Sequence, residues 1–305
     1  MLATLVDEPF SRAGWLFEPK LDGERCLVVR RSRDLHLYSR NRKRLDEKYP
    51  EVMAACAAQT ARTYIADGEL VTFENGVTSF AVLQQRMHVA RPSAELLRRV
   101  PVWLYLFDLL YLGEYDTQQV PLRYRKAVLR DALDFGAALR FTEHREREGE
   151  AYYREACARR WEGIIAKNGD SAYVSCRTRD WLKFKCVNEQ EFVIGGFTDP
   201  KGDRLGFGAL LVGYYRGGKL VYAGKVGTGF DTATLQQLSR RLAQLEIDHS
   251  PFVPDGVPRR HVHWVKPRLV AQIRFTEWTA DGRLRHPRFR GQRDDTRPTE
   301  VVREG

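Results

Sequence analysis

The chain lacks several features that mark special classes of protein. No apolar run approaches the roughly 18 to 20 residues that a membrane-spanning helix requires. Residues 1–8 have neither the basic start nor the long apolar core of a signal peptide. Repeats and low-complexity segments are missing, and 43% hydrophobic with 30% charged residues is an ordinary globular composition. We therefore expect a cytoplasmic protein without membrane attachment.

Cysteine is scarce, and its spacing forms no pattern. The five cysteines are Cys26, Cys56, Cys157, Cys176 and Cys186, and no two stand as Cys-x-x-Cys. An odd number without close pairs indicates neither a disulfide framework nor a cysteine zinc site. We expect buried or half-buried free thiols. The seven histidines form no cluster either, and His261-Val-His263 is better explained by strand alternation than by a metal site.

Acidic residues are outnumbered by basic ones, which leaves a net charge of +10 and a pI of about 9.4. The excess is concentrated towards the C-terminus, where residues 191–305 hold 19 Lys and Arg against 13 Asp and Glu. A basic balance of this kind favours nucleic acid as a partner, although a solvated basic face would give the same count.

The length of 305 residues suggests two domains. The first part is predicted to be mixed α and β, with strand-like runs at 15–19, 25–30, 64–71 and 102–107. Helical spacing of apolar residues occurs at 49–60, 122–135 and 150–160. Asp22-Gly23 predicts a hairpin turn between the first two strands.

After residue 187 the pattern changes to closely spaced strands, a Gly217-Gly218 turn and one helix from about Asp231 to Leu245, with Asp231 as its N-cap. Several strands around one helix are typical of a small Greek-key barrel of the OB type. We therefore expect an α+β chain with domains at 1–187 and 188–305.

Short polar segments carry the chemistry, and they follow one another in a recognisable order. They are Lys20-Leu-Asp-Gly-Glu-Arg25, Ser39-Arg-Asn-Arg42, Asp67-Gly-Glu69, Leu106-Phe-Asp-Leu109, Glu162-Gly-Ile-Ile-Ala-Lys167, Trp181-Leu-Lys-Phe-Lys185 and Arg285-His-Pro-Arg-Phe-Arg-Gly-Gln-Arg-Asp-Asp295. The first segment alone is equally well explained by a surface turn with a solvated lysine. In this order, the set resembles the ATP-dependent DNA ligases. The segments at 191–198, 223–230 and 277–282 resemble more narrowly the ligase domain of the bacterial end-joining ligase D.

The resemblance implies a nucleotidyltransferase domain of ATP-grasp-like ligase type, with antiparallel sheets, followed by an OB-fold barrel. It also implies that Lys20 attacks the α-phosphate of ATP, that AMP passes to the 5′-phosphate of nicked DNA, and that the 3′-hydroxyl then displaces AMP. A free lysine has a pKa near 10.4, so neighbouring cations or desolvation must lower that pKa before the amine can attack. Lys183 and Lys185, alternate residues on one strand, are expected to supply both effects, although Lys-Phe-Lys alone would suit a half-buried edge strand.

Other site residues follow from the same resemblance. A divalent cation, Mg²⁺ or Mn²⁺, is expected at Glu162 and Glu69, since oxygen ligands suit these hard ions. Phe107 is expected to stack on adenine, although without its motif it would be assigned to the core. The residues expected to bind the nucleotide are Glu18, Arg25, Arg40, Glu69, Phe107, Lys167 and Arg293.

The expected partner is nicked or broken duplex DNA, bound by a monomer. Five arginines fall within residues 283–293 without one acid, which suits either a solvated turn or a face that follows phosphates. The residues expected to contact DNA are Arg40, Arg42, Arg283, Arg285, Arg288 and Arg290. The bacterial Ku end-binding protein and separate polymerase or nuclease subunits are implied as partners by resemblance only.

Three other functions would share parts of this pattern. An RNA ligase or capping-type guanylyltransferase uses the same lysine chemistry and stays the alternative. An NAD-dependent ligase is disfavoured because no paired-cysteine zinc segment is present, and a binding scaffold without activity is disfavoured by the intact lysines and glutamates. One residue departs from the resemblance: where related ligases have Arg-x-Asp-Lys, this chain has Arg293-Asp-Asp295-Thr296, which predicts slow adenylylation of the enzyme.

Overall fold

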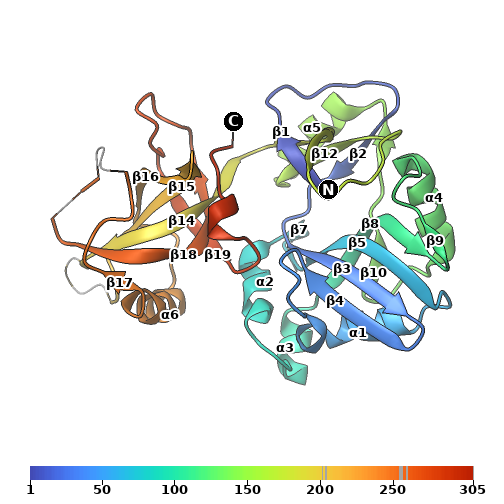
Figure 1. Ribbon diagram of the computed structural model, residues 1–305, viewed down its shortest axis with the longest axis horizontal. Helices are drawn as coiled ribbons and strands as arrows, with labels where there is room; N and C mark the ends of the chain where they lie inside the picture. The colour runs from blue at the N-terminus through green and yellow to red at the C-terminus, as the bar shows by residue number, and fades with distance from the viewer. Residues whose placement is uncertain (201, 203–204, 254–256, 259, 305) are drawn as a thin grey trace. The chain divides into compact units, whose positions relative to one another are not determined.

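The structure is a computed structural model that describes residues 1–304 except 201, 203–204, 254–256 and 259 (Figure 1). The chain divides into two compact units, Met1–Cys186 and Val187–Glu304. Each unit combines helices with mainly antiparallel sheets, so the α+β class expected from the sequence is confirmed. Among the described residues, no helix is both long and apolar enough to span a membrane.

One sheet of the first unit has the strand order β1-β13-β12-β2-β11. Its strands are β1 (Leu2–Leu5), β2 (Trp15–Pro19), β11 (Arg145–Glu146), β12 (Gly163–Asn168) and β13 (Arg177–Lys185). Only the pair β1–β13 within this sheet is parallel. Helix α5 (Gly149–Ala158) packs on β2 and β12, where Tyr152 and Ala156 join Phe17, Ile164 and Phe184 in a buried apolar cluster.

The other large sheet of this unit has the order β10-β8-β5-β3-β4, with β9 paired to β8. Its strands are β3 (Glu24–Arg31), β4 (Asp34–Ser39), β5 (Thr63–Val71), β8 (Trp103–Leu112), β9 (Tyr115–Asp116) and β10 (Leu139–Phe141). The elements around it are η1 (Asp46–Lys48), α1 (Pro50–Ala57), β6 (Phe73–Glu74), β7 (Val77–Thr78), α2 (Phe80–Met87), α3 (Ala94–Arg99) and α4 (Leu122–Ala132). Helices α1, α4 and α5 confirm the predicted ones, whereas α2 and α3 were not predicted.

The predicted hairpin at Asp22-Gly23 is wrong. Strand β2 belongs to the sheet with β12, and β3 pairs with β4 and β5 in the other sheet, so this dipeptide is a crossing between sheets. Gly23 passes so close to β5 that a Cβ there would lie 2.1 Å from the Leu70 carbonyl oxygen. Asp22 caps α2 by accepting a hydrogen bond from the Phe80 N–H at 3.1 Å. The turn residues are thus used for close approach and capping.

The second unit is built on a sheet of order β16-β15-β14-β18-β17, with β19 paired to β18. Its elements are β14 (Asn188–Thr198), β15 (Leu210–Arg216), β16 (Lys219–Val226), α6 (Thr232–Ala243), β17 (Glu246–Ile247), β18 (Val262–Phe275), β19 (Arg288–Arg293) and η2 (Pro298–Glu300). Asp231 caps α6 as predicted, accepting from the Thr234 N–H at 2.7 Å. Gly217 and Gly218, both at positive φ, turn β15 into β16. Within the described residues the sheet order does not close, so the predicted barrel stays a prediction.

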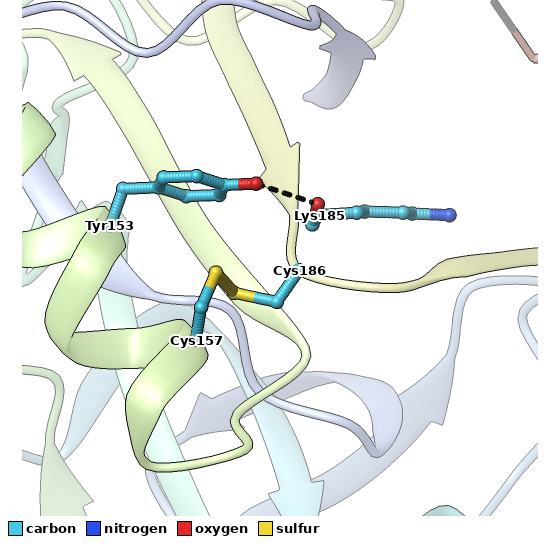
Figure 2. The surroundings of a disulfide bond; sticks show 4 residues. All are labelled: Tyr153, Cys157, Lys185 and Cys186. Atoms are coloured by element: carbon cyan, nitrogen blue, oxygen red, sulfur yellow. Dashed lines mark hydrogen bonds between the residues drawn. A yellow bond between two sulfur atoms is a disulfide. The ribbon is translucent and has the colours of Figure 1, made fainter.

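Cys157 and Cys186 form a disulfide, which corrects the expectation that both were free thiols. Their separation of 29 residues gives no local signal of pairing, but α5 packs on the sheet that contains β13 and brings the two sulfurs together. Figure 2 shows the bond beside a second link, in which the Tyr153 hydroxyl donates to the Lys185 carbonyl oxygen at 3.1 Å. The end of β13 is therefore fastened to α5 at two consecutive residues.

Candidate functional site

The site is built on one face of the sheet that contains β2, β12 and β13. Glu18 on β2 lies opposite Ile165 on β12, which in turn lies opposite Lys183 on β13. Residues two apart on a strand point to the same side, so the neighbours of these three share their face. The polar and aromatic side chains on this face include Glu18, Lys167, Trp181, Lys183 and Lys185. Two of the predicted motifs therefore meet here, together with Glu18.

Lys20 follows β2 directly and is held at two points. Its backbone N–H donates to the Gly163 carbonyl oxygen at 2.9 Å, and its Nζ lies 2.5 Å from Glu162 Oε2. The Lys20 side chain is 19% exposed and that of Glu162 is 7% exposed. A Cβ at position 163 would lie 1.9 Å from the Phe184 carbonyl oxygen, so this approach of strands requires Gly163. The predicted nucleophile and the predicted metal ligand are thus in contact.

The electrostatic surroundings of Lys20 differ from those predicted. Burial alone would lower the pKa of Lys20, but the adjacent Glu162 carboxylate outweighs it, and Asp22 and Glu69 add to that effect. The pKa of Lys20 is therefore raised above its usual value, so the expectation of a lowered pKa is not met. The effect of the carboxylates on the Lys20 pKa exceeds the effect of burial because Glu162 contacts Nζ directly.

Arg25 on β3 makes a bidentate ion pair with Asp67 on β5. Its Nε lies 2.5 Å from Asp67 Oδ1 and its Nη2 lies 2.6 Å from Oδ2. The Tyr173 hydroxyl also donates to Asp67 Oδ2, at 2.7 Å. Burial raises the pKa of the Tyr173 hydroxyl, and the neighbouring Asp67 charge raises it further, so this donor keeps its proton. Arg25 is held in place by the first residue of the Asp-Gly-Glu motif.

Phe107 on β8 is 7% exposed and is covered by cations. Lys167 Nζ lies 4.1 Å from its ring centroid, and the Arg25 guanidinium lies 4.7 Å from it. Trp181 packs edge-on against the same ring at 5.8 Å, and Lys167 Nζ is 4.0 Å from the indole. Phe107 and Trp181 thus form a buried aromatic pair, with Lys167 over both rings and Arg25 over Phe107.

Glu18 is nearly inaccessible and is paired with two lysines. Its Oε1 accepts from Lys126 Nζ at 2.6 Å, and its Oε2 lies 2.6 Å from Lys167 Nζ. Burial alone would raise the pKa of the Glu18 carboxyl, but the two lysine charges outweigh it and hold that pKa below its usual value. Burial, opposed by Glu18, lowers the pKa of Lys167 to about 8.

Three further predicted residues lie on or next to the sheet that contains β3, β4 and β5. Glu69 on β5 is opposite Arg25 on β3 and Tyr105 on β8, and its charge reaches Lys20. Arg40 and Arg42 occupy the turn after β4, where Arg42 is exposed at a positive φ and its N–H donates to the Ser39 carbonyl oxygen at 2.8 Å. This turn presents basic side chains at the surface of the first unit.

A divalent cation is compatible with this donor set. Glu162 offers a carboxylate beside Lys20, and Glu69 adds a second negative charge. Among the described residues, no three His, Cys, Asp or Glu side chains group together as a metal site. One or two carboxylates suit Mg²⁺, which usually keeps several waters and takes further ligands from substrate phosphates.

Most of the predicted residues of the second unit have acidic partners. Arg293 pairs with Asp295 through two contacts at 2.9 and 2.7 Å, and Thr296 donates to Glu191 Oε1 at 2.8 Å. Arg285 lies 2.5 Å from Glu277, and Arg290 is 3.9 Å from Glu189. The remaining two are Arg283, which donates to the Tyr222 carbonyl oxygen, and the exposed Arg288. Most of these arginines are therefore partly neutralised before any ligand binds.

Sequence reasoning placed Asp67 and Trp181 in motifs without giving them a role, and it missed Lys126. A signal for Lys126 existed, because it stands four residues after Leu122 and three before Leu129, on the apolar stripe of α4. A lysine on a stripe that faces the core needs a buried acceptor. Trp181 begins the motif that ends in Lys183 and Lys185, and strand alternation places it on their face.

Two family models match the chain. The model described as "ATP dependent DNA ligase domain" matches residues 1–185, and "ATP dependent DNA ligase C terminal region" matches residues 203–296. The solved structure described as "mycobacterial DNA ligase D complexed with ATP and MES" matches with a TM-score of 0.65 and 35% identity, over 99% of this chain and 98% of that one.

Curated relatives agree with the family models. The chain is 36% identical over 311 residues to the multifunctional non-homologous end joining protein LigD of Pseudomonas aeruginosa, covering 99% of this chain and 36% of that protein. It is 39% identical over 299 residues to the multifunctional non-homologous end joining DNA repair protein LigD of Mycobacterium tuberculosis, covering 95% and 37%. The chain thus spans little more than a third of the length of these relatives.

Proposed function

The chain belongs to the ATP-dependent DNA ligase family, and we propose that it seals nicks in duplex DNA through a covalent lysyl–AMP intermediate. The contact between Lys20 Nζ and Glu162 Oε2 carries the proposal, because it places a nucleophilic side chain against an acidic group in a partly closed site. In the first step, Nζ forms a bond to the α-phosphorus of ATP while the bond to pyrophosphate breaks. Before this attack Lys20 must lose a proton to solvent, because Glu162, which lies 2.5 Å from Nζ, is the carboxylate assigned to the metal ion.

The later steps use the same face of the sheet. AMP passes from Lys20 to the 5′-phosphate of the nick, and the 3′-hydroxyl then attacks that phosphate and releases AMP. Both steps place negative charge on phosphate oxygens, which cationic side chains stabilise. Lys183 and Lys185 lie on the face that bears Glu18 and Lys167, so they are assigned this role.

The nucleotide is assigned to the side chains around Phe107. Adenine would stack on Phe107 once a cation that lies over this ring, Lys167 or Arg25, has moved aside. Glu18 and Lys167 would then meet its edge, and the ribose would meet Glu69. Arg25, Arg40 and Arg293 are assigned to phosphate or sugar oxygens, since a guanidinium suits paired oxygen acceptors. Mg²⁺ or Mn²⁺ held by Glu162 and Glu69 would neutralise charge on the phosphates.

We assign the nucleotidyl transfer to residues 1–187, and to residues 188–305 an OB-type fold that binds DNA. The DNA-contacting residues are proposed to be Arg40, Arg42, Arg283, Arg285, Arg288 and Arg290. The relatives named for non-homologous end joining support a role in that pathway, with the bacterial Ku end-binding protein and polymerase or nuclease subunits as partners. A cytoplasmic monomer is the state proposed. The RNA ligase or guanylyltransferase alternative is not favoured, because both family models are those of DNA ligases.

Intact mass spectrometry tests the proposal directly. The protein is incubated with Mg²⁺ and with ATP, GTP or NAD in separate reactions, and we expect one AMP to be added with ATP alone. Sealing of a nicked duplex and of the same nick in RNA is measured in parallel. A GMP adduct, or faster sealing of RNA, would favour the alternative instead.

A further inference from the structure

Lys126 is a buried cation for which the reaction described above has no use. It comes from α4, and its side chain is 1% exposed. Nζ donates to Glu18 Oε1 at 2.6 Å and to the Thr142 carbonyl oxygen at 2.9 Å, with the Phe141 ring centroid 4.6 Å away. Two acceptors from different elements fix the ammonium in one place, so Glu18 Oε1 is also fixed.

Each carboxylate oxygen of Glu18 contacts a different lysine. Lys167 on β12 lies at Oε2, within the cation-binding aromatic pair Phe107 and Trp181, whereas Lys126 lies at Oε1. A buried carboxylate with one cation could turn about its side chain or take up a proton. A carboxylate with two cations keeps both its orientation and its charge, and an ionised carboxylate is solely a hydrogen-bond acceptor.

Purine nucleotides differ at the group that such an acceptor would read. Adenine carries a 6-amino group, which donates, whereas guanine carries a 6-oxo group, which accepts, and unsubstituted purine carries neither. An ionised carboxylate beside the ring edge would accept a hydrogen bond from the 6-amino group of adenine and would repel the 6-oxo group of guanine. With unsubstituted purine it would have no partner at this position. A site built around a hydrogen bond from the substrate rejects analogues that lack the donor.

We infer that Lys126 is a positioning residue, which holds Glu18 as the acceptor for the 6-amino group of ATP and thereby sets the preference for ATP over other purine nucleoside triphosphates. This inference rests on the proposed adenylylation and on the placement of adenine beside Glu18. Lys126 itself touches no reacting atom, so its effect is on nucleotide choice and on KM for ATP.

The test compares self-adenylylation by ATP, by the triphosphate of unsubstituted purine riboside and by GTP, in wild type and in Lys126→Met. We expect kcat/KM for ATP to exceed that for the purine riboside analogue in wild type. In Lys126→Met we expect this ratio to fall about tenfold, through a higher KM for ATP, as when one charge-assisted hydrogen bond is weakened. Lys126→Arg keeps the charge and is expected to retain most of the ratio.

Arg130→Met is the matched control, since Arg130 also lies on α4 and over Phe141, at 4.3 Å, but pairs with Glu143. Arg130→Met should leave the ratio of kcat/KM for ATP to that for the analogue unchanged.

Equal losses with ATP and with the analogue in Lys126→Met would mean a purely structural role for Lys126 and would overturn the inference. An unchanged ratio in Lys126→Met would overturn it too. If Lys126→Met does not fold, the same ratio is measured in Lys126→Gln, which retains a hydrogen-bond donor without charge. A lower ratio there supports the inference, and an unchanged ratio or equal losses with both nucleotides overturn it. Absence of any adduct in wild type would instead refute the proposed function.

Discussion

Lys20 and Glu162 form an ion pair with 2.5 Å between Nζ and Oε2, so the proposed nucleophile is held as an ammonium. Lys20 follows β2 and Glu162 precedes β12, and the pairing of these strands places the two side chains together. The contact makes proton removal from Lys20 a condition of the proposed first chemical step.

The first prediction concerns Lys20 itself. Lys20→Ala and Lys20→Arg are both expected to abolish the AMP adduct, because alanine has no nucleophile and the arginine guanidinium stays protonated. Intact mass after incubation with ATP and Mg²⁺ measures this. An adduct on either variant would show that another residue is the nucleophile.

The second prediction concerns pH. Because the pKa of Lys20 is raised, the reactive amine is scarce at neutral pH, and kcat/KM for adenylylation should rise without a plateau between about pH 6 and 9. In Glu162→Gln the main group that raises this pKa is gone, so the profile should move to lower pH even though the rate itself falls. A wild-type profile that levels off within this range, or the same pH dependence in wild type and Glu162→Gln, would contradict the ion pair.

Much of the site was predictable from the sequence because its residues occur in short segments with fixed internal spacing. Strand alternation alone places Lys183 and Lys185 on one face. The pairing of Glu18 with Lys126 joins residues more than a hundred positions apart, and only the fold brings these together. The pKa of Lys20 could not be predicted either, since it depends on which of the nearby charges comes closest.

The Asp22-Gly23 dipeptide and the cysteines show where local reasoning fails in the fold. Asp-Gly favours a hairpin when the flanking strands pair with each other, but β2 and β3 each find other partners. Cys157 and Cys186 meet because α5 packs on its sheet, and no spacing rule records that packing. In both cases tertiary contacts override the local signal.

The third prediction concerns the disulfide. Unfolded protein without reductant should titrate three free thiols, from Cys26, Cys56 and Cys176, and five after reduction. Replacing Cys157 and Cys186 together with Ser should lower the free energy of unfolding by about 2–4 kcal/mol, since the bridge restricts the unfolded chain. Urea unfolding measures this, with Cys176→Ser as a control expected to change little. Five titratable thiols before reduction would contradict the pairing.

The fourth prediction concerns DNA. Replacing Arg283, Arg285 and Arg290 together with Ala should weaken binding to a nicked duplex and flatten its salt dependence, by about 0.9 in the log–log slope for each phosphate that is no longer neutralised. The control replaces Arg91, Arg98 and Arg99, exposed residues in and before α3, and makes the same change in net charge. Equal slopes in the two triple variants would mean that the arginines at 283–290 form only a solvated surface.

The last prediction concerns Thr296, which the resemblance to the ligases places where a lysine is expected. Its hydroxyl donates to Glu191 Oε1 at 2.8 Å, and Arg293 Nε lies 3.4 Å from the same oxygen. Arg293 also pairs with Asp295, so one arginine and one hydroxyl face two carboxylates. A hydroxyl brings no positive charge to a leaving pyrophosphate. We therefore expect Thr296→Lys to accelerate self-adenylylation and to leave sealing by preformed lysyl–AMP unchanged.

Thr296→Met separates charge from size in this test, because methionine extends nearly as far without an ammonium. Single-turnover rates of adenylylation and of sealing are measured on wild type and on both variants. Faster adenylylation in Thr296→Lys alone would assign the effect to the added charge. A charge that reached the leaving pyrophosphate would have to change the rate of adenylylation. Equal rates in the lysine and methionine variants would therefore mean that Glu191 neutralises the new ammonium, or that this segment does not act in the first step.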